Sequence, residues 1–223
     1  MKFIKETLLV SATLSLTSTA FGAVTVLTFE GLKDLEPVLE FYNGGQGGGG
    51  SGPGPNYGIQ FNADALAVID SDAGGSGNFG GEPSPSTAVA FLTGSAVMNI
   101  AAGFETGFSF FYSAIQVPGV VKVYDDLNAT GTLLATIQLP LTPINGAPDP
   151  TGDFSPLVPT GVAFAGIAKS VDFGGAFNGI GFDNITFGAS DPVIPEASTV
   201  FSVIGLGALA GSTWCRARRS SRS

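Results

Sequence analysis

Short apolar runs recur about every ten residues through the middle of the chain, separated by Gly, Pro, Asn or Asp. This spacing is typical of an all-β domain, a single β-sandwich with a jelly-roll-like arrangement. The 33 glycines and 14 prolines among 223 residues favour tight turns over long helices. We expect strands at 24–30, 58–62, 65–70, 88–92, 97–101, 107–113, 120–124, 133–139, 162–167, 170–173 and 180–187.

One expected strand carries a continuous aromatic face. Phe104, Phe108, Phe110 and Tyr112 are spaced so that their side chains lie on the same side, while Phe111 points the other way. This pattern predicts an interior strand that is covered on both faces, with the aromatic face in the core. A platform for stacking sugars is the alternative interpretation.

Two stretches interrupt the strand pattern. Residues 44–55 read GGQGGGGSGPGP, which predicts a surface loop too flexible to order itself. The loop lacks the lysine and following Ser or Thr of a phosphate-binding loop. Residues 145–159 are rich in proline and predict a long loop between strands.

The first 22 residues have the features of a secretory signal peptide, which forms a short helix before it is removed. Lys2 and Lys5 precede an apolar stretch, and small residues around Ala20 and Gly22 permit cleavage. We therefore expect export through the Sec translocon, cleavage by signal peptidase and a β-domain over 23–190. An amphipathic helix belonging to the domain is the alternative.

The C-terminal segment, 191–223, predicts a transmembrane helix. Residues 199–215 are apolar or small and uncharged, and at 1.5 Å per residue they reach about 25 Å, close to the thickness of a thin bilayer core. Arg216, Arg218 and Arg219 follow at once, and such a basic flank stays on the cytoplasmic side. A buried C-terminal helix is the alternative.

The tail has three parts in a fixed order: the motif Pro195, Glu196, Ala197 and Ser198, the apolar span, and the arginine cluster. This order resembles the PEP-CTERM sorting domain family, although Ala197 departs from the commonest residue of that motif. The resemblance implies recognition by an exosortase. It also implies an inner-membrane-anchored precursor that is later delivered to the cell surface or extracellular matrix.

Charge is unevenly distributed along the chain. Residues 23–194 hold sixteen of the eighteen acidic residues but only three of the nine basic ones. Such a segment disfavours nucleic acid as a partner and favours a cation or a neutral polymer such as an extracellular polysaccharide. The sequence has no histidine, and its one cysteine, Cys215, lies in the expected span. The usual general base and transition-metal ligand are therefore missing, as is any disulfide within the chain.

Glu30 and Asp183 form the candidate metal site. A regular strand would turn Asp183 toward the core with Ile185, and pairing of the first and last strands would bring Glu30 beside it. A calcium ion bound by both acids and by backbone carbonyls would satisfy a buried carboxylate. This part of the chain looks similar to carbohydrate-binding and lectin-like sandwiches that hold such an ion. In the alternative, Asp183 and Asn184 cap a bulge through backbone amides.

Two other acidic pairs are better interpreted as turns. Asp70 and Asp72 precede glycines as in a calcium loop, but the acid expected at the twelfth position of such a loop is absent, so we expect an Asx-turn. Asp125 and Asp126 indicate a hairpin turn.

These features predict an exported structural or adhesive protein that is not an enzyme. A calcium-dependent carbohydrate-binding module is the alternative. A carboxylate glycosidase is the third hypothesis, and it requires two acids about 5–9.5 Å apart across one cleft. The only tryptophan, Trp214, lies in the tail, which disfavours a glycosidase.

Overall fold

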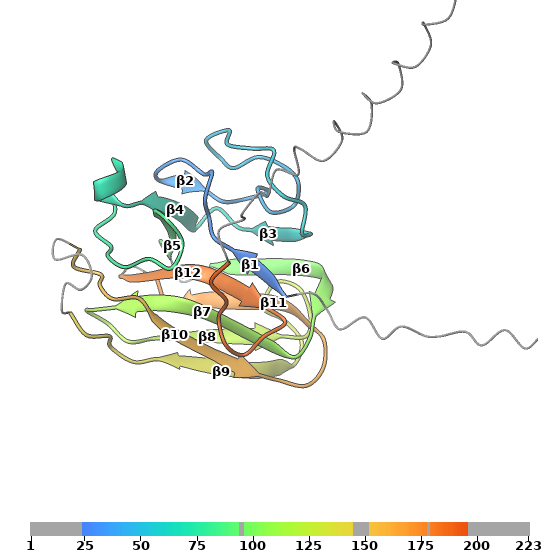
Figure 1. The fold of residues 1–223 in the computed structure, drawn as a ribbon. Coiled ribbons are helices and arrows are strands. Elements are labelled where there is room, and N and C mark those ends of the chain that lie inside the picture. Colours follow the sequence, from blue (N-terminus) through green and yellow to red (C-terminus); the bar gives the residue numbers. More distant parts are fainter. Residues whose placement is uncertain (1–23, 94–95, 145–151, 178, 196–223) are drawn as a thin grey trace, which may run out of the picture.

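The chain forms two antiparallel β-sheets with one short 3-10 helix, η1 (Ser71–Ala73), in a computed structural model that describes residues 24–93, 96–144, 152–177 and 179–195 (Figure 1). The expected all-β architecture of two sheets is confirmed in this part of the chain. The signal segment 1–22 and the span 199–215 lie outside the described residues. No helix within the described ranges is both long and apolar enough to cross a bilayer.

The larger sheet has seven strands in the order β10-β7-β12-β5-β4-β2, and β1 also pairs with β12. These strands are β1 (Thr25–Leu27), β2 (Glu36–Pro37), β4 (Ala65–Ile69), β5 (Thr87–Phe91), β7 (Gly107–Ala114), β10 (Val158–Ala163) and β12 (Ile180–Phe187). The smaller sheet has the order β3-β6-β11-β8-β9. Its strands are β3 (Ile59–Phe61), β6 (Val97–Phe104), β8 (Gly119–Tyr124), β9 (Leu133–Leu139) and β11 (Ala168–Gly175).

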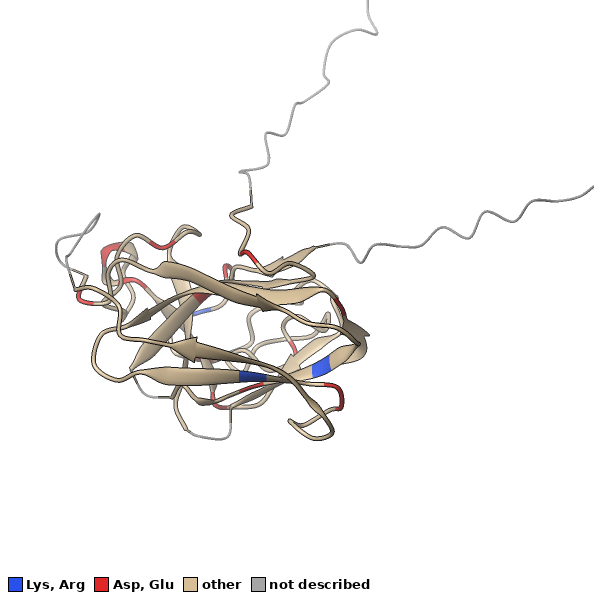
Figure 2. Cartoon of the chain, turned by 90° about the horizontal axis from the view of Figure 1, so that it is seen from below, with Lys and Arg blue, Asp and Glu red and all other residues tan. Residues whose placement is uncertain are grey.

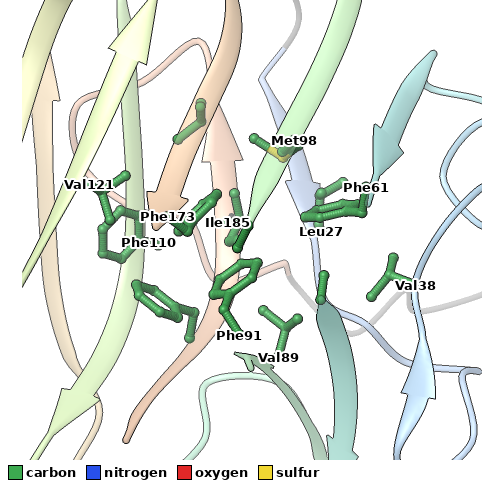
Figure 3. Close-up of a cluster of buried hydrophobic side chains, with 14 of the residues drawn as sticks. Leu27, Val38, Phe61, Val89, Phe91, Met98, Phe110, Val121, Phe173 and Ile185 are labelled. Carbon is green, nitrogen blue, oxygen red and sulfur yellow. The ribbon is translucent and has the colours of Figure 1, made fainter. Parts of the chain in front are cut away.

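Aromatic side chains from both sheets form the centre of the core. Phe173 of β11 packs against Phe91, Phe110 and Phe182 of the opposite sheet, with ring centroids 4.3, 6.4 and 5.4 Å apart. Figure 3 shows Phe91, Phe110 and Phe173 together with aliphatic side chains. All four rings are fully buried, and burial of each contributes about 1.5–3 kcal/mol. These contacts join the two sheets into one sandwich.

The aromatic face predicted from the sequence is core. Phe108, Phe110 and Tyr112 of β7 are buried, and β7 lies between β10 and β12, so it is an interior strand as expected. The expectation that Phe104 belongs to the same strand is wrong, because the chain turns at Thr106 and Phe104 ends β6, from where its ring packs against the same cluster. The alternative interpretation of this face as a sugar platform is wrong, because the other sheet covers these rings.

The strand expected at 162–167 begins and ends earlier, because β10 spans Val158–Ala163. Pro159 argued against a strand there, since proline lacks an amide hydrogen for the ladder. β10 is the edge of its sheet, where a proline is tolerated. The loop expected to reach residue 159 therefore ends before Val158. The strand β2 was not expected, because two residues are too few to show an alternation of apolar and polar positions.

The glycine-rich segment 44–55 is ordered, contrary to the expectation of a flexible loop. It folds around the carboxylate of Glu36, which is 3% exposed. Oε1 of Glu36 accepts hydrogen bonds from the amides of Gly49 (2.7 Å) and Ser51 (2.9 Å). Oε2 accepts from the hydroxyl of Ser51 (2.5 Å) and the amide of Lys33 (2.8 Å). Although burial opposes the effect, these bonds hold the pKa of Glu36 below its usual range.

Glycine is required in this loop where the backbone passes close to its neighbours. A Cβ on Gly54 would lie 2.3 Å from the carbonyl oxygen of Phe41. The loop backbone can therefore lie directly on the segment that includes Phe41. Because glycine has no side chain, a glycine-rich segment is flexible when it stands alone. In this loop, the same property permits close packing of the backbone.

Candidate functional site

Two strands share one edge of β12 and leave a gap between them. β1 pairs antiparallel with the end of β12, with Thr25 opposite Phe187 and Leu27 opposite Ile185. β5 pairs with the beginning of β12 at residues 181 and 182. The expected pairing of first and last strands is confirmed. Asp183 and Asn184 lie between the two partner strands.

A bulge at this gap places Asp183 and Ile185 on opposite sides of the sheet. The register of β12 against β7 shifts between Asp183 and Thr186, and Asn184 has a φ of 47°. Phe182 belongs to the core between the sheets, so its neighbour Asp183 faces the opposite side. The expectation that Asp183 shares the side of Ile185 is wrong, because the bulge interrupts the strand alternation.

Asp183 is fully buried beneath the loop that precedes β5. Its Oδ2 accepts a hydrogen bond from the amide of Ser84 at 3.0 Å, and its Oδ1 accepts one from the amide of Asn184 at 2.6 Å. The hydroxyl of Ser84 lies 2.8 Å from both oxygens. Burial raises the pKa of Asp183 to about 8, the bonds from Ser84 and Asn184 oppose the rise, and the negative charge of Glu30 adds to it.

Glu30 binds the same loop a little further along. Its Oε1 accepts hydrogen bonds from the amides of Ser86 (3.0 Å) and Thr87 (2.8 Å), and its Oε2 lies 3.4 and 3.2 Å from their hydroxyls. The hydroxyl of Ser84 also lies 3.3 Å from the carbonyl oxygen of Thr28. Glu30 and Asp183 therefore hold one short loop from two sides.

Tyr42 borders this cluster. Its hydroxyl accepts a hydrogen bond from the amide of Phe29 at 2.6 Å, and its ring packs edge-on against Phe29 at 5.7 Å. Burial raises the pKa of Tyr42, and the charges of Asp183 and Glu30 add to the effect. Sequence analysis missed Tyr42 and Ser84, which contact the cluster from loops with no hydrophobic period.

The cluster offers only oxygen donors, which suit calcium better than a transition metal. Within the described ranges, no three His, Cys, Asp or Glu side chains gather into a metal-binding group. A calcium ion between Glu30 and Asp183 would therefore take its other ligands from carbonyls such as that of Thr28. The bulge and the bond from Asn184 also match the alternative in which Asp183 caps a bulge.

The other acidic pairs form turns, as expected. Oδ2 of Asp70 accepts a hydrogen bond from the amide of Asp72 at 3.2 Å and caps η1. Asp125 accepts from the amide of Thr132 at 2.6 Å, and this bond holds its pKa below the usual range. Oδ1 of Asp126 accepts from the amide of Leu127 at 2.8 Å.

Only the first residue of the expected sorting motif, Pro195, lies within the described chain, where it is exposed. The segment before it is tied to β12 at Val193, whose amide donates to Oγ1 of Thr186 and whose carbonyl accepts from Nδ2 of Asn184, both at 3.2 Å. Six other residues of the expected sorting and membrane signals fall outside the described residues: Glu196, Ala197, Ser198, Arg216, Arg218 and Arg219.

Most described acidic residues lie on loops and turns, as Figure 2 shows. Only Glu36, Asp172 and Asp183 lie on described strands. The charge of the domain is therefore concentrated at the ends and edges of the sandwich.

Comparison with known proteins gives weak structural likenesses. No family model matches the chain, and no curated protein matches it. The K2 cleaved adhesin domain of Lys-gingipain aligns at 11% identity and a TM-score of 0.42, over 74% of this chain and 97% of that chain. A carbohydrate-binding module from Cellvibrio mixtus lichenase 5A, in complex with cellotriose, aligns at 12% identity and a TM-score of 0.35, over 57% and 88%. A β-1,3-glucan-binding CBM6 from Bacillus halodurans aligns at 14% identity and 0.33, over 61% and 87%.

Proposed function

We propose that this chain is an exported, exosortase-processed β-sandwich with a structural or adhesive role at the cell surface or in the extracellular matrix. One observation supports the processing step. The buried hydrophobic residues of the described chain all lie between Leu27 and Phe187, and the last hydrogen bonds to β12 are made at Val193. Cleavage after Pro195 would therefore keep all of these contacts.

A non-enzymatic role is part of this proposal. The most buried carboxylates, those of Glu36 and Asp183, accept hydrogen bonds from loop amides, as does Glu30. A general acid or nucleophile needs its carboxyl group directed at a substrate. These acids stabilise loops instead.

Mass spectrometry of the protein's termini tests the export route. Inner membrane, outer membrane and medium are separated from the native host with and without its exosortase. We expect an outer or extracellular form that ends near Pro195 and disappears without the exosortase. An intact arginine tail retained in the inner membrane of both strains would refute this route and leave a protein anchored by a single span.

Calcium-dependent carbohydrate binding is the second candidate function. The juxtaposition of Glu30 and Asp183 favours it, because two acids near one another and a carbonyl form part of an oxygen ligand set. Under this candidate, calcium stabilises the loop before β5, and removal of calcium by a chelator abolishes sugar binding.

A further inference from the structure

Two segments flank the glycine loop and pair with each other. The amide of Phe61 donates to the carbonyl of Leu39 at 3.0 Å, and the amide of Tyr57 donates to the carbonyl of Tyr42 at 2.8 Å. Tyr57 is 47% exposed, and its ring stacks on the buried ring of Tyr42, with centroids 6.1 Å apart and planes 12° apart. An exposed aromatic ring is thus held against a ring fixed in the core.

A hydrogen-bonded polar network joins the same pair of segments. Oε2 of the exposed Glu40 accepts from Nδ2 of Asn43 at 2.8 Å and from Nε2 of Gln60 at 3.0 Å. Nε2 of Gln60 also lies 3.2 Å from Oε1 of Glu40. Each amide also has a carbonyl oxygen that can accept a hydrogen bond from a hydroxyl group. The three side chains are therefore held in place before any ligand arrives.

The network continues across the smaller sheet. Gln60 of β3 is opposite Asn99 of β6, so their Cβ atoms are about 5 Å apart on the same face. Nδ2 of Asn99 donates to Oδ1 of Asn128 at 2.9 Å, and the amide of Asn128 donates to Oδ1 of Asn99 at 2.8 Å. We call the row formed by Asn43, Glu40, Gln60, Asn99 and Asn128 the amide strip.

We propose that Tyr57 and the amide strip form a binding surface for a neutral polysaccharide. The apolar face of a sugar ring packs on an exposed aromatic ring, and its hydroxyl groups donate to carboxylates and both donate to and accept from carboxamides. Tyr57 contacts Tyr42 through its ring and Gln60 contacts Glu40 through its side chain, so the ring and the strip meet along the same short segment and one chain of sugars could reach both. This inference rests on the proposed adhesive function and names its ligand class.

The charge of the amide strip indicates whether it binds a neutral or an acidic polymer. Glu40 is central to the amide strip and would repel a uronate, sulfate or phosphate group. Lys33, seven residues before Glu40, directs its Nζ away to the carbonyl oxygen of Gly49 at 2.7 Å. The five strip residues include no cation. The strip itself therefore favours a neutral polymer over a polyanion.

Affinity electrophoresis tests the proposal directly. The full-length chain is purified in a detergent without a sugar headgroup and run in native gels that contain barley β-glucan, dextran or galactomannan. We expect at least one neutral polymer to retard the protein, and Tyr57→Ala and Gln60→Ala each to weaken that affinity by at least about tenfold. Phe177→Ala is the matched control, since Phe177 is 48% exposed on the loop between β11 and β12 and lies outside the strip.

Thermal unfolding of each variant separates a lost contact from a lost fold. Retardation that Tyr57→Ala and Gln60→Ala leave unchanged would overturn the proposal, as would stronger retardation by the polyanion alginate or none by the three neutral polymers. If the protein binds the neutral polymers but keeps its tail in the host, the proposed site is supported and the export route is refuted. If the protein is processed but binds none of the polymers, the export route is supported and the proposed site is refuted.

Discussion

Glu30 in the turn after the first strand and Asp183 in the last strand hold the same loop, one at Ser86 and Thr87 and the other at Ser84. The two carboxylates lie close enough that the charge of Glu30 raises the pKa of Asp183. This pair closes the gap that β1 and β5 leave along β12. The stability of the domain should therefore depend on how these carboxylates are protonated or bound.

The fully buried Asp183 makes the stability fall with rising pH. Its pKa is about 8 when folded and 3.8 in the reference state, so over this range the folded protein holds a proton that the unfolded chain has released. The free energy of unfolding is thus greatest below about pH 4 for this group and falls toward pH 8, by at most about 1.4 kcal/mol per pH unit. Urea unfolding at about pH 5 and about pH 8 measures the difference. Asp183→Asn should reduce this difference in stability, whereas Asp191→Asn, at an exposed position, should leave it unchanged. An equal difference in the wild-type protein and both variants would contradict this role of Asp183.

Calcium provides a separate test of the same pair. If Glu30 and Asp183 bind the ion, free calcium at a hundred times its dissociation constant should stabilise the fold by about 2.7 kcal/mol. Asp183→Asn and Glu30→Gln should each remove this gain, while Asp191→Asn should keep it. Thermal unfolding with calcium and with chelator measures the effect. Identical curves for the wild-type protein would eliminate the calcium-dependent candidate.

Removal of the Glu36 carboxylate should release the glycine loop. Glu36→Ala leaves the amides of Lys33, Gly49 and Ser51 without their acceptor, which costs about 2–4 kcal/mol. Because folding lowers the pKa of Glu36, this residue contributes its full share to the free energy of unfolding above pH 4.5. The contribution is lost as the pH falls through the pKa that Glu36 has in the folded protein. Limited proteolysis within 44–55 and urea unfolding report the change. The exposed Glu40→Ala should stay within about 0.5 kcal/mol of wild type.

Two glycines of this loop should respond differently to alanine. A Cβ on Gly54 meets the carbonyl oxygen of Phe41 at 2.3 Å, so Gly54→Ala forces the loop away from its neighbour. Gly50 has open space around a Cβ but a φ of 85°, so Gly50→Ala costs only about 1–2 kcal/mol of backbone strain. Urea unfolding should therefore rank Gly54→Ala as the more destabilised variant. The reverse order would show that the loop does not pack closely.

Alanine substitutions at two phenylalanines four positions apart should have very different effects on stability. Phe173→Ala removes the ring that joins the two sheets and should cost about 3–5 kcal/mol. Phe177→Ala removes a ring that is 48% exposed and should change stability by less than about 0.5 kcal/mol. Chemical unfolding measures both values. A small loss for Phe173→Ala would mean that the core is not packed around this ring.

The strand positions could largely be predicted because apolar residues alternate with polar ones where one face meets the core. The aromatic face of β7 followed from this alternation, whereas the pairing of β1 with β12 was expected because they are the first and last strands. The pattern failed at Asp183, where the bulge at Asn184 reverses the side on which the next residues lie. A bulge adds one residue without changing composition, so parity alone cannot locate it.

The loops were less predictable because tertiary contacts determine their order. Glycine content predicted a flexible segment at 44–55, but a single buried acid, Glu36, binds two of its residues, Gly49 and Ser51. The aromatic surface was missed for a related reason. Tyr57 and Gln60 lie on a short pair of segments, and their neighbours Asn99 and Asn128 come from distant parts of the chain.

The pairing of Thr25 with Phe187 also sets how the domain responds to mechanical load. Thr25 and Phe187 lie at the same end of one antiparallel pair, and the chain beyond Phe187 is still bonded to β12 at Val193. A force that pulls the two ends of the chain apart first breaks the bonds of Val193 and then separates the three paired positions of β1 one after another. A force between the C-terminal end and a ligand on the strip must instead pass along β12, which is bonded to β7 over most of its length. The domain should therefore open easily when pulled from both ends and resist when pulled between its tail and a bound polymer.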